Sequence, residues 1–303
     1  MEKPSISDWI EAMRLRTLPL SLSSILAGSA IVTDKSAPYI SILILAILTT
    51  IVLQILSNLA NDYGDTQNGA DGIDRVGPAR AVQTGTISAN QMKRAIYISG
   101  VLAFGLGTAL VLTRFLQTHN WVMISVFIAL GIGAIAAAVK YTAGKNPYGY
   151  RGMGDLFVFL FFGFVGVGGT YFLLQNQLHW SIILLSTTIG AFSTAVLNLN
   201  NMRDIHSDSK AGKRTLVVIM GPQKAKAYHF SLVTIGWLSL IIHLLLFRTN
   251  NWMWLTLIFL PIHTKHLVKV YNVTIPSEFD GELKLIALST FGISLLLFIL
   301  TYL

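Results

Sequence analysis

Long uninterrupted stretches of apolar residues recur along the whole chain, separated by shorter polar segments. Each stretch approaches the roughly 20 residues that a helix needs to cross the hydrocarbon core of a bilayer. Lipid offers the backbone no hydrogen-bonding partners, so such segments are expected to be helices. We count nine: Leu18–Val32, Tyr39–Leu56, Ala95–Leu112, Trp121–Val139, Leu156–Leu174, Trp180–Leu197, Tyr228–Phe247, Trp252–Val270 and Leu285–Leu303. The pattern predicts one all-α integral membrane domain over residues 1–303, with nine transmembrane helices.

Composition supports this prediction. Only 12% of the 303 residues are charged and 53% are hydrophobic, whereas an ordinary soluble domain is about 25% charged. A soluble all-helical protein is the alternative. The first stretch, which is short, and the eighth, which contains Pro261, His263 and Lys265, are the least typical spans. The chain has no cysteine, which excludes disulfides and thiolate metal sites. The polar N-terminus, with no cleavage site after the first apolar run, argues against a cleavable signal peptide.

The positive charges lie mostly on one side of the predicted helices. If the nine helices alternate in direction, 19 of the 22 Lys and Arg residues lie on the same side of the membrane as the N-terminus. The exceptions are Lys35, Arg114 and Arg248. The positive-inside rule then places the N-terminus in the cytoplasm and the C-terminus outside. This distribution accounts for the net charge of +8 without a nucleic-acid partner. The two long loops and almost all of the acidic residues lie on this side, so any chemistry is expected to face the cytoplasm.

Two similar polar phrases follow the second and sixth apolar stretches. In the first, Asn58, Asn61, Asp62 and Asp65 are spaced i, i+3, i+4 and i+7, so they share one face of a helix. The second begins at Asn198, and its Asn201, Asp204 and Asp208 are spaced i, i+3 and i+7. Helix capping is the simpler reading, but carboxylates are unfavourable at a helix C-terminus. The repetition also suggests two related halves, about 18–140 and 156–270, followed by a ninth helix at 285–303.

Clustered carboxylate and amide oxygens are typical ligands of Mg²⁺. Basic residues follow each phrase, including Arg80 after the first and Lys213 after the second. Carboxylates that hold a metal ion, next to Lys and Arg side chains that can bind the remaining oxygen atoms of the same ligand, indicate a bound polyanion. Two further segments are candidates for the same site. The first contains Lys140 and Tyr141, although residues of these types also serve as anchors at the membrane interface. The second is the amphipathic N-terminal segment, whose Arg14 could reach the site. The seven histidines show no clustering, and His206 is read as incidental.

These motifs resemble those of the UbiA superfamily of intramembrane prenyltransferases over nearly the whole chain. Asn61, Asp62 and Asp65 match the N-D-x-x-D motif of that family. The next Asp of the commonest form would stand at position 69, where this chain has Gly69, and Asp71 follows instead. That spacing, together with the segments Arg14–Pro19, Asn201–Ile205 and Gly212–Leu216, is most similar to the enzymes that prenylate 1,4-dihydroxy-2-naphthoate in menaquinone synthesis.

The resemblance implies a central cavity among the helices, a cytoplasmic cap and a location in a bacterial inner membrane. It implies a reaction between a polyprenyl diphosphate and 1,4-dihydroxy-2-naphthoate, with loss of CO₂ and pyrophosphate. It implies two Mg²⁺ ions, replaceable by Mn²⁺, held by Asp62 and Asp65 with Asn61, and by Asp204 and Asp208. The residues expected to contact the substrates are Asn58, Asn61, Arg203, Lys213, Lys140, Tyr141, Arg14 and Arg80. Asp71 and Asp155 are the candidates for a base that acts on the acceptor.

Other functions remain open at this stage. Acceptors such as 4-hydroxybenzoate or homogentisate would use the same motifs. A cation-coupled transporter also has intramembrane acids and repeats, but its site lies near the middle of the bilayer, whereas these acids lie at one face. A phosphatidyl-transfer enzyme would require a D-G-x-x-A-R phrase, and the spacing of Asp71-Gly72 and Ala79-Arg80 does not match it.

Overall fold

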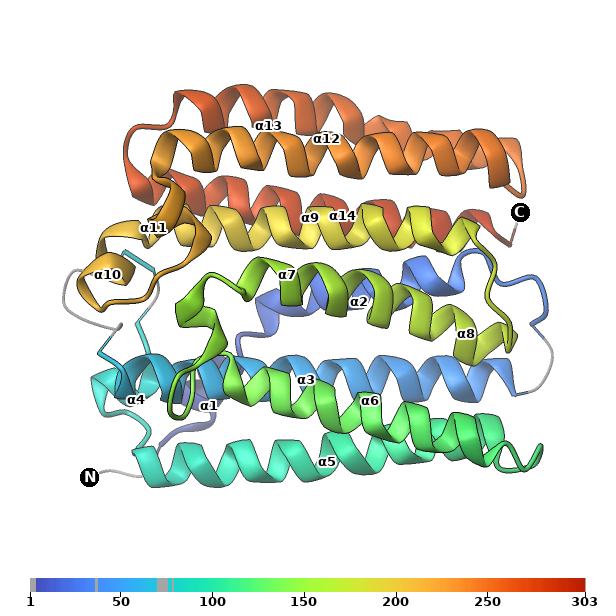
Figure 1. The fold of residues 1–303 in the computed structure, drawn as a ribbon, viewed down its shortest axis with the longest axis horizontal. Helices are drawn as coiled ribbons and strands as arrows, with labels where there is room; N and C mark the ends of the chain where they lie inside the picture. Colours follow the sequence, from blue (N-terminus) through green and yellow to red (C-terminus); the bar gives the residue numbers. More distant parts are fainter. Residues whose placement is uncertain (1–3, 36–37, 70–75, 78, 303) are drawn as a thin grey trace.

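The computed structural model describes residues 4–35, 38–69, 76–77 and 79–302, and within these ranges every regular element is a helix. The long helices lie side by side along one axis (Figure 1). Short helices gather at the end of the bundle that carries the N-terminus, and the C-terminus lies at the opposite end. The expectation of an all-α architecture is therefore confirmed.

The first part of the chain contributes three long helices and several short ones. The short helix α1 (Ile6–Met13) begins with a capping box in which Ser5 and Asp8 exchange hydrogen bonds, a strong helix-start signal. The elements that follow are η1 (Leu15–Thr17), α2 (Leu18–Ser29), α3 (Tyr39–Gln67), α4 (Ala81–Thr84), α5 (Ala89–Phe115) and α6 (Trp121–Lys140). Helix α3 packs against α5, and α5 packs against α6.

The second part continues the bundle. A short turn η2 (Tyr148–Arg151) leads into one continuous span made of α7 (Gly154–Val158), the π-helical η3 (Phe159–Gly168) and α8 (Gly169–Gln175). Helix α9 (Ser181–Arg203) lies at the centre and is the most buried of the long helices. The remaining elements are α10 (Ile205–Lys210), α11 (Leu216–Met220), α12 (Pro222–Phe247), η4 (Asn251–Phe259), α13 (Leu260–Asn272), η5 (Pro276–Glu278) and α14 (Phe279–Leu300).

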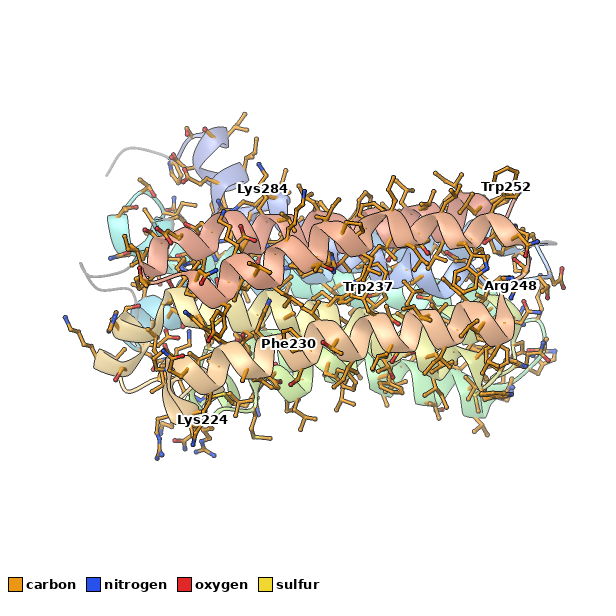
Figure 2. The ribbon with its side chains drawn as sticks, turned by 90° about the horizontal axis from the view of Figure 1, so that it is seen from above. Lys224, Phe230, Trp237, Arg248, Trp252 and Lys284 are labelled. Atoms are coloured by element: carbon orange, nitrogen blue, oxygen red, sulfur yellow. The ribbon has the colours of Figure 1, made fainter. Side chains whose placement is uncertain are left out.

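Seven of the described helical segments are long and apolar enough to cross a membrane. The remaining two of the nine predicted spans correspond to α2, which has only 12 residues, and to η4 with α13, where a tighter helix precedes Pro261. Both run along the bundle beside the longer helices (Figure 1). In Figure 2, Lys224 and Lys284 lie toward the end that carries α10, and Arg248 and Trp252 lie at the opposite end.

The long helices extend beyond the predicted apolar stretches. The second stretch ends at Leu56, but α3 continues to Gln67 and so contains Asn58 to Asp65. Likewise α9 continues to Arg203, and Asp204 forms only a slight break before α10. The spacing argument therefore applies to real helical turns, and the loop between α3 and α5 is shorter than expected.

Small residues allow η3 to approach its neighbours closely. A methyl group on Gly166 would lie 2.7 Å from Cβ of Ser24 in α2, and one on Gly163 would meet the backbone oxygen of Ser186 in α9. Without a hydrophobic drive between helices in lipid, such small-residue contacts provide much of the packing energy. They hold α2, η3 and α9 as one unit behind the cavity described below.

Three histidines that looked scattered in the sequence meet among α12, α13 and α14. Nε2 of His229 and Nε2 of His266 are 2.8 Å apart, and Nδ1 of His266 lies 2.6 Å from Glu282. His263 accepts a hydrogen bond from Trp237, midway along α12. The interpretation that the histidines do not cluster was wrong, because their contacts join helices that are far apart in sequence.

Candidate active site

The two polar phrases end at the same pole of the molecule. The C-terminal ends of α3 and α9 both point toward the end of the bundle where α4, α10 and α11 lie (Figure 1). Asp62 and Asp65 on α3, and Asp204 and Asp208 after α9, are all at least 95% buried. Such burial of carboxylates requires nearby hydrogen bonds or cations.

Asp65 contacts two other parts of the chain. Its Oδ2 accepts a hydrogen bond of 3.0 Å from Nη2 of Arg80, and its Oδ1 accepts one of 2.9 Å from the hydroxyl of Tyr150. Both partners reach α3 from loops, so Asp65 anchors two segments of the cap. Arg80 was predicted from the sequence to belong to this site. Tyr150 belongs to the polar segment after Lys140, whose tyrosines were expected as aromatic walls, but its contact with Asp65 was not foreseen.

Lys213 joins the two phrases. Its Nζ lies 3.6 Å from Oδ1 of Asp65 and 3.4 Å from Oδ1 of Asp208. The backbone fixes this position, because the amide of Lys213 donates a 2.8 Å hydrogen bond to the carbonyl of Asp208. Acids from two distant parts of the sequence therefore share a single cation.

Burial and neighbouring charges shift the pKa values of this cluster. Burial raises the pKa of Asp208 to about 6, and the charges of Asp204 and Asp65 add to that effect, while Lys213 opposes it. For Lys213, burial lowers the pKa, but Asp65 and Asp208 more than compensate, so its pKa is raised. Lys213 thus remains a cation at neutral pH. A centre with an excess of buried carboxylate attracts further cations.

Asp62 has a different set of partners. Its two oxygens accept hydrogen bonds from the amides of Ala81 and Val82, at 2.9 and 3.1 Å. These amides open the short helix α4, so Asp62 satisfies donors that a helix start leaves free. In this structure Asp62 holds the segment around Arg80 against α3, and its role as a metal ligand stays a prediction.

Asp204 is paired with its sequence neighbour. Nε and Nη2 of Arg203 donate to the two oxygens of Asp204 at 2.8 and 2.7 Å, a bidentate pair of the strong kind. Nη1 of Arg203 also donates to Asp280, in the first turn of α14, at 2.6 Å. Arg203 therefore connects α9 to the last helix of the bundle. The contact with Asp280 was not foreseen, and contact of Arg203 with a polyanion stays a prediction.

The asparagines of the first phrase link α3 to other segments. Nδ2 of Asn58 donates to the carbonyl of Met13 and to the hydroxyl of Thr17, both at 2.9 Å. Oδ1 of Asn61 accepts a hydrogen bond from Thr142 at 3.1 Å. Both asparagines also line the large cavity. In the second phrase, Asn198 is fully buried, and neither atom of its amide has a hydrogen-bond partner.

A long apolar cavity of about 1180 Å³ begins beside this polar cluster. Along α3 it runs from Asn61 to Ala46, a distance of about 22 Å at the helical rise per residue, and its far end reaches Trp180. Aromatic rings line the entrance: Tyr141 meets Tyr148 at 5.4 Å, Tyr148 stacks on Phe157 at 4.1 Å, and Phe157 lies 6.1 Å from Phe161. The cavity can hold a long apolar molecule whose polar end faces the carboxylates.

The other predicted residues occupy varied positions. Tyr141 lines the cavity; burial, then the nearby charges of Asp155, Asp65 and Asp208, raise its pKa well above the usual value. Arg14 is half-buried at the end of α1 and adopts a left-handed backbone conformation with φ of 50°. Lys140 is exposed at the end of α6, outside the buried cluster. Asp71 lies outside the described residues.

The donor set suits a hard cation that arrives with an anionic ligand. Among the residues with described positions, no group of three or more His, Cys, Asp or Glu side chains is arranged to hold a metal. However, Oδ2 of Asp208 is buried without a hydrogen-bond partner, and Asp65 and Asp208 converge on one cation. Mg²⁺ commonly takes one or two carboxylates and completes its shell with water and phosphate oxygens, so these residues fit it.

Comparison with known proteins agrees with this geometry. Residues 21–277 match the model of the UbiA prenyltransferase family. The chain is 41% identical to a 1,4-dihydroxy-2-naphthoate octaprenyltransferase of Haemophilus influenzae, over 89% of this chain and 87% of that protein. It is 42% identical to the Escherichia coli protein of the same name, over 85% and 82%.

Solved structures show the same fold at low identity. A UbiA homolog from Archaeoglobus fulgidus, bound to DMAPP and Mg²⁺, aligns with a TM-score of 0.62 at 15% identity, over 94% of this chain and 98% of that one. A digeranylgeranylglyceryl phosphate synthase aligns with a TM-score of 0.56 at 16% identity, over 97% and 99%. Because the family model matches most of its length, this chain belongs to the UbiA prenyltransferase family.

Proposed function

We propose that this protein transfers a polyprenyl group from an isoprenoid diphosphate to 1,4-dihydroxy-2-naphthoate, giving demethylmenaquinone in its reduced, quinol form. The observation that carries the proposal is the sharing of Lys213 by Asp65 and Asp208 beside an apolar cavity with an aromatic entrance. The names of relatives at 41% and 42% identity supply the acceptor and an octaprenyl donor.

In the proposed reaction the allylic C–O bond breaks, and a new bond forms between that carbon and the ring carbon bearing the carboxylate. That carboxylate leaves as CO₂, and the bond electrons of the diphosphate leave with pyrophosphate, so the charges balance without an added proton. Lys213 and Arg80 are placed to neutralise charge that grows on the leaving group, which is commonly the largest catalytic contribution. Tyr141 and Tyr148 shield the allylic carbon from water, and their ring faces favour a nearby cation.

We further propose that Mg²⁺ binds with the diphosphate, two ions in all, and that Mn²⁺ can substitute. Asp65 and Asp208 would hold them, with Asp62, Asp204 and Asn61 as further oxygen donors. When bound, the metal neutralises the diphosphate and favours its departure. The neighbouring structure bound to DMAPP and Mg²⁺ supports this assignment by fold alone. Asp62 and Asp204 must exchange their present partners to take part.

The proposed arrangement in the membrane is nine helices, with the N-terminus and the carboxylate end of the bundle in the cytoplasm of a bacterial cell and the C-terminus outside. The absence of cysteine allows a direct test with single introduced cysteines. Lys224 and Gln117 are both exposed, in segments at opposite ends of the bundle. In intact cells, a membrane-impermeant maleimide should label Gln117→Cys and spare Lys224→Cys until the membrane is opened. The reverse labelling would invert the orientation.

The activity is tested with purified protein in detergent, octaprenyl diphosphate and Mg²⁺. We expect prenylation of 1,4-dihydroxy-2-naphthoate that EDTA abolishes and Mn²⁺ restores. Parallel reactions with 4-hydroxybenzoate and homogentisate identify the preferred acceptor, and a faster reaction with either would replace the naphthoate assignment. Metal-driven solute uptake into proteoliposomes, with no prenyl transfer, would instead indicate a transporter.

A further inference from the structure

Tyr150 contacts both charged groups at the centre of the site, although it belongs to neither acidic phrase. Its hydroxyl donates a 2.9 Å hydrogen bond to Oδ1 of Asp65. Nζ of Lys213 lies 5.4 Å from the centre of its ring, within the distance at which a ring face attracts a cation. One side chain therefore contacts the carboxylate of the first phrase and the ammonium group that follows the second.

The backbone around Tyr150 fixes its position. Its carbonyl accepts a 3.1 Å hydrogen bond from the amide of Arg214, which is next to Lys213 in the chain. One residue before Tyr150, the amide of Gly149 donates to the carbonyl of Tyr141 at 3.0 Å, and a methyl group on Gly149 would lie 2.6 Å from that oxygen. The turn η2 is thus joined to the cavity wall on one side and to the segment of Lys213 on the other.

The hydroxyl of Tyr150 and the ammonium group of Lys213 compete for one oxygen. Oδ1 of Asp65 is 2.9 Å from the hydroxyl but 3.6 Å from Nζ of Lys213. A direct bond between an ammonium group and a carboxylate is about 2.7–2.9 Å long, so this ion pair is not closed. Oδ2 of the same carboxylate is bonded to Arg80 at 3.0 Å. Tyr150 therefore holds Asp65 at a distance from the lysine.

An open ion pair leaves both of its members available to a ligand. A carboxylate oxygen has two lone pairs, so Oδ1 of Asp65 can accept from Tyr150 and still coordinate a cation. An ammonium group has three donors, so Lys213 can keep its contact with Asp208 while it binds a phosphate oxygen. Without the hydroxyl, Asp65 and Lys213 can close into a direct pair in which each neutralises the other. Metal and diphosphate would then have to break that pair before they bind.

We propose that Tyr150 is a positioning residue that keeps the pair of Asp65 and Lys213 open. Its hydroxyl orients the carboxylate for Mg²⁺, and its ring steadies the ammonium group for the diphosphate. This role rests on the proposed function, since Mg²⁺ and a diphosphate are taken as the ligands of the site. Tyr150 acts through the other two residues and requires no contact with either ligand.

Tyr150→Phe tests the hydroxyl alone, because the ring remains. Electron paramagnetic resonance measures the affinity for Mn²⁺ in the presence of inorganic pyrophosphate, without the acceptor. Loss of a hydrogen bond that orients a metal ligand costs about 10- to 100-fold in metal affinity, and we expect a loss in this range. In the prenyl-transfer assay, the Mg²⁺ concentration for half-maximal rate should rise by a similar factor, while saturating Mg²⁺ should restore most of the wild-type kcat.

Three further variants separate the parts of the proposal. Tyr150→Leu also removes the ring, and relative to Tyr150→Phe it should raise the KM for octaprenyl diphosphate by roughly 2- to 10-fold. In a Lys213→Met background, Tyr150→Phe should weaken Mn²⁺ binding less than it does in the wild type, because Asp65 has no ammonium group to close on. Tyr97→Phe, which changes an exposed tyrosine of α5, is the matched control and should leave the Mn²⁺ affinity unchanged.

The melting temperature distinguishes positioning from folding. Weaker Mn²⁺ binding by a Tyr150→Phe protein that melts as the wild type does supports the proposal. Wild-type Mn²⁺ affinity in this variant, a loss of kcat that excess Mg²⁺ does not restore, or equal effects in the two Lys213 backgrounds would overturn it. If the wild type binds Mn²⁺ with pyrophosphate but does not prenylate the naphthoate, the proposed acceptor is wrong, and the effect of Tyr150 on metal binding is still measured separately.

Discussion

The side-chain nitrogen of Lys213 lies 3.6 Å from Oδ1 of Asp65, although the two residues belong to different halves of the sequence. Asp65 ends one long helix and Lys213 follows another, so the contact exists only because α3 and α9 end at the same pole of the bundle. The same nitrogen also contacts Asp208. This one cation therefore marks the point where the two acidic phrases meet.

Removal of the Lys213 charge should reduce catalysis strongly. Lys213→Ala takes away a buried cation that faces the leaving group, and we expect kcat to fall by about 100-fold or more. Lys210→Ala, an exposed lysine of the same segment, is the matched control and should stay within about twofold of wild type. Steady-state rates with octaprenyl diphosphate measure both. Equal activity of the two variants would remove Lys213 from the diphosphate site.

Binding of Mg²⁺ and diphosphate should free two backbone amides of α4. The amides of Ala81 and Val82 now donate to Asp62. If Asp62 turns to a metal ion, these amides lose their acceptor, and their hydrogen exchange should become faster. Exchange measured by mass spectrometry, with and without Mg²⁺ and pyrophosphate, checks this. Slower or unchanged exchange in the peptide containing these two residues would leave Asp62 as a capping residue and exclude it as a ligand.

A methyl group at Gly64 should separate α3 from the segment after α6. Its Cβ would lie 2.5 Å from the carbonyl carbon of Thr142, so the backbone must move, and overpacking of this kind costs roughly 1–3 kcal/mol. Gly64→Ala should lower both the melting temperature and kcat, since Asp62 and Asp65 flank this position. Gly105→Ala, in a helix position with open space around it, provides the control. A Gly64→Ala protein as stable and active as Gly105→Ala would show that this contact does not position the site.

Metal binding should weaken in acid because of Asp208. Burial raises its pKa to about 6 from 3.8, so the folded protein binds this proton more tightly than the unfolded chain. The contribution of Asp208 to the free energy of unfolding of the metal-free protein therefore decreases as the pH rises from about 4 to about 6. Mg²⁺ requires the ionised carboxylate, so the increase in melting temperature caused by Mg²⁺ should be small well below pH 6 and full above pH 7. Asp208→Asn should remove this pH dependence; an unchanged profile in the variant would assign it to another group.

Hydropathy predicted most of the fold, because a lipid-embedded helix must be apolar over its whole length. The exceptions were α2 and the η4–α13 segment, where short length and polar residues such as His263 weaken the signal. The helical spacing of the first phrase also predicted a shared helix for Asn58 to Asp65. What spacing does not reveal is the partner of each side chain, and the four residues on that helix face contact three different segments, around Thr17, Thr142 and Arg80.

The unforeseen contacts all depend on how distant segments pack. Tyr150 binds Asp65, and Asp280 binds Arg203, yet neither residue stands in a recognisable motif. The contact between His229 and His266 was unforeseen for the same reason, because it joins two different helices. Asp155 was a candidate base from the sequence, but its buried oxygen without a hydrogen-bond partner became visible only once the helices were in place. Local periodicity thus predicts elements, and tertiary packing decides which side chains form the site.

The central claim is that both acidic phrases hold the metal ions of one diphosphate site. Electron paramagnetic resonance with Mn²⁺ and inorganic pyrophosphate counts the ions bound to the protein directly, without the acceptor. The account predicts two pyrophosphate-dependent Mn²⁺ ions per chain in the wild type, and loss of tight binding in both Asp65→Asn and Asp208→Asn. Wild-type binding by either variant would show that its phrase does not hold the metal, and would contradict the account.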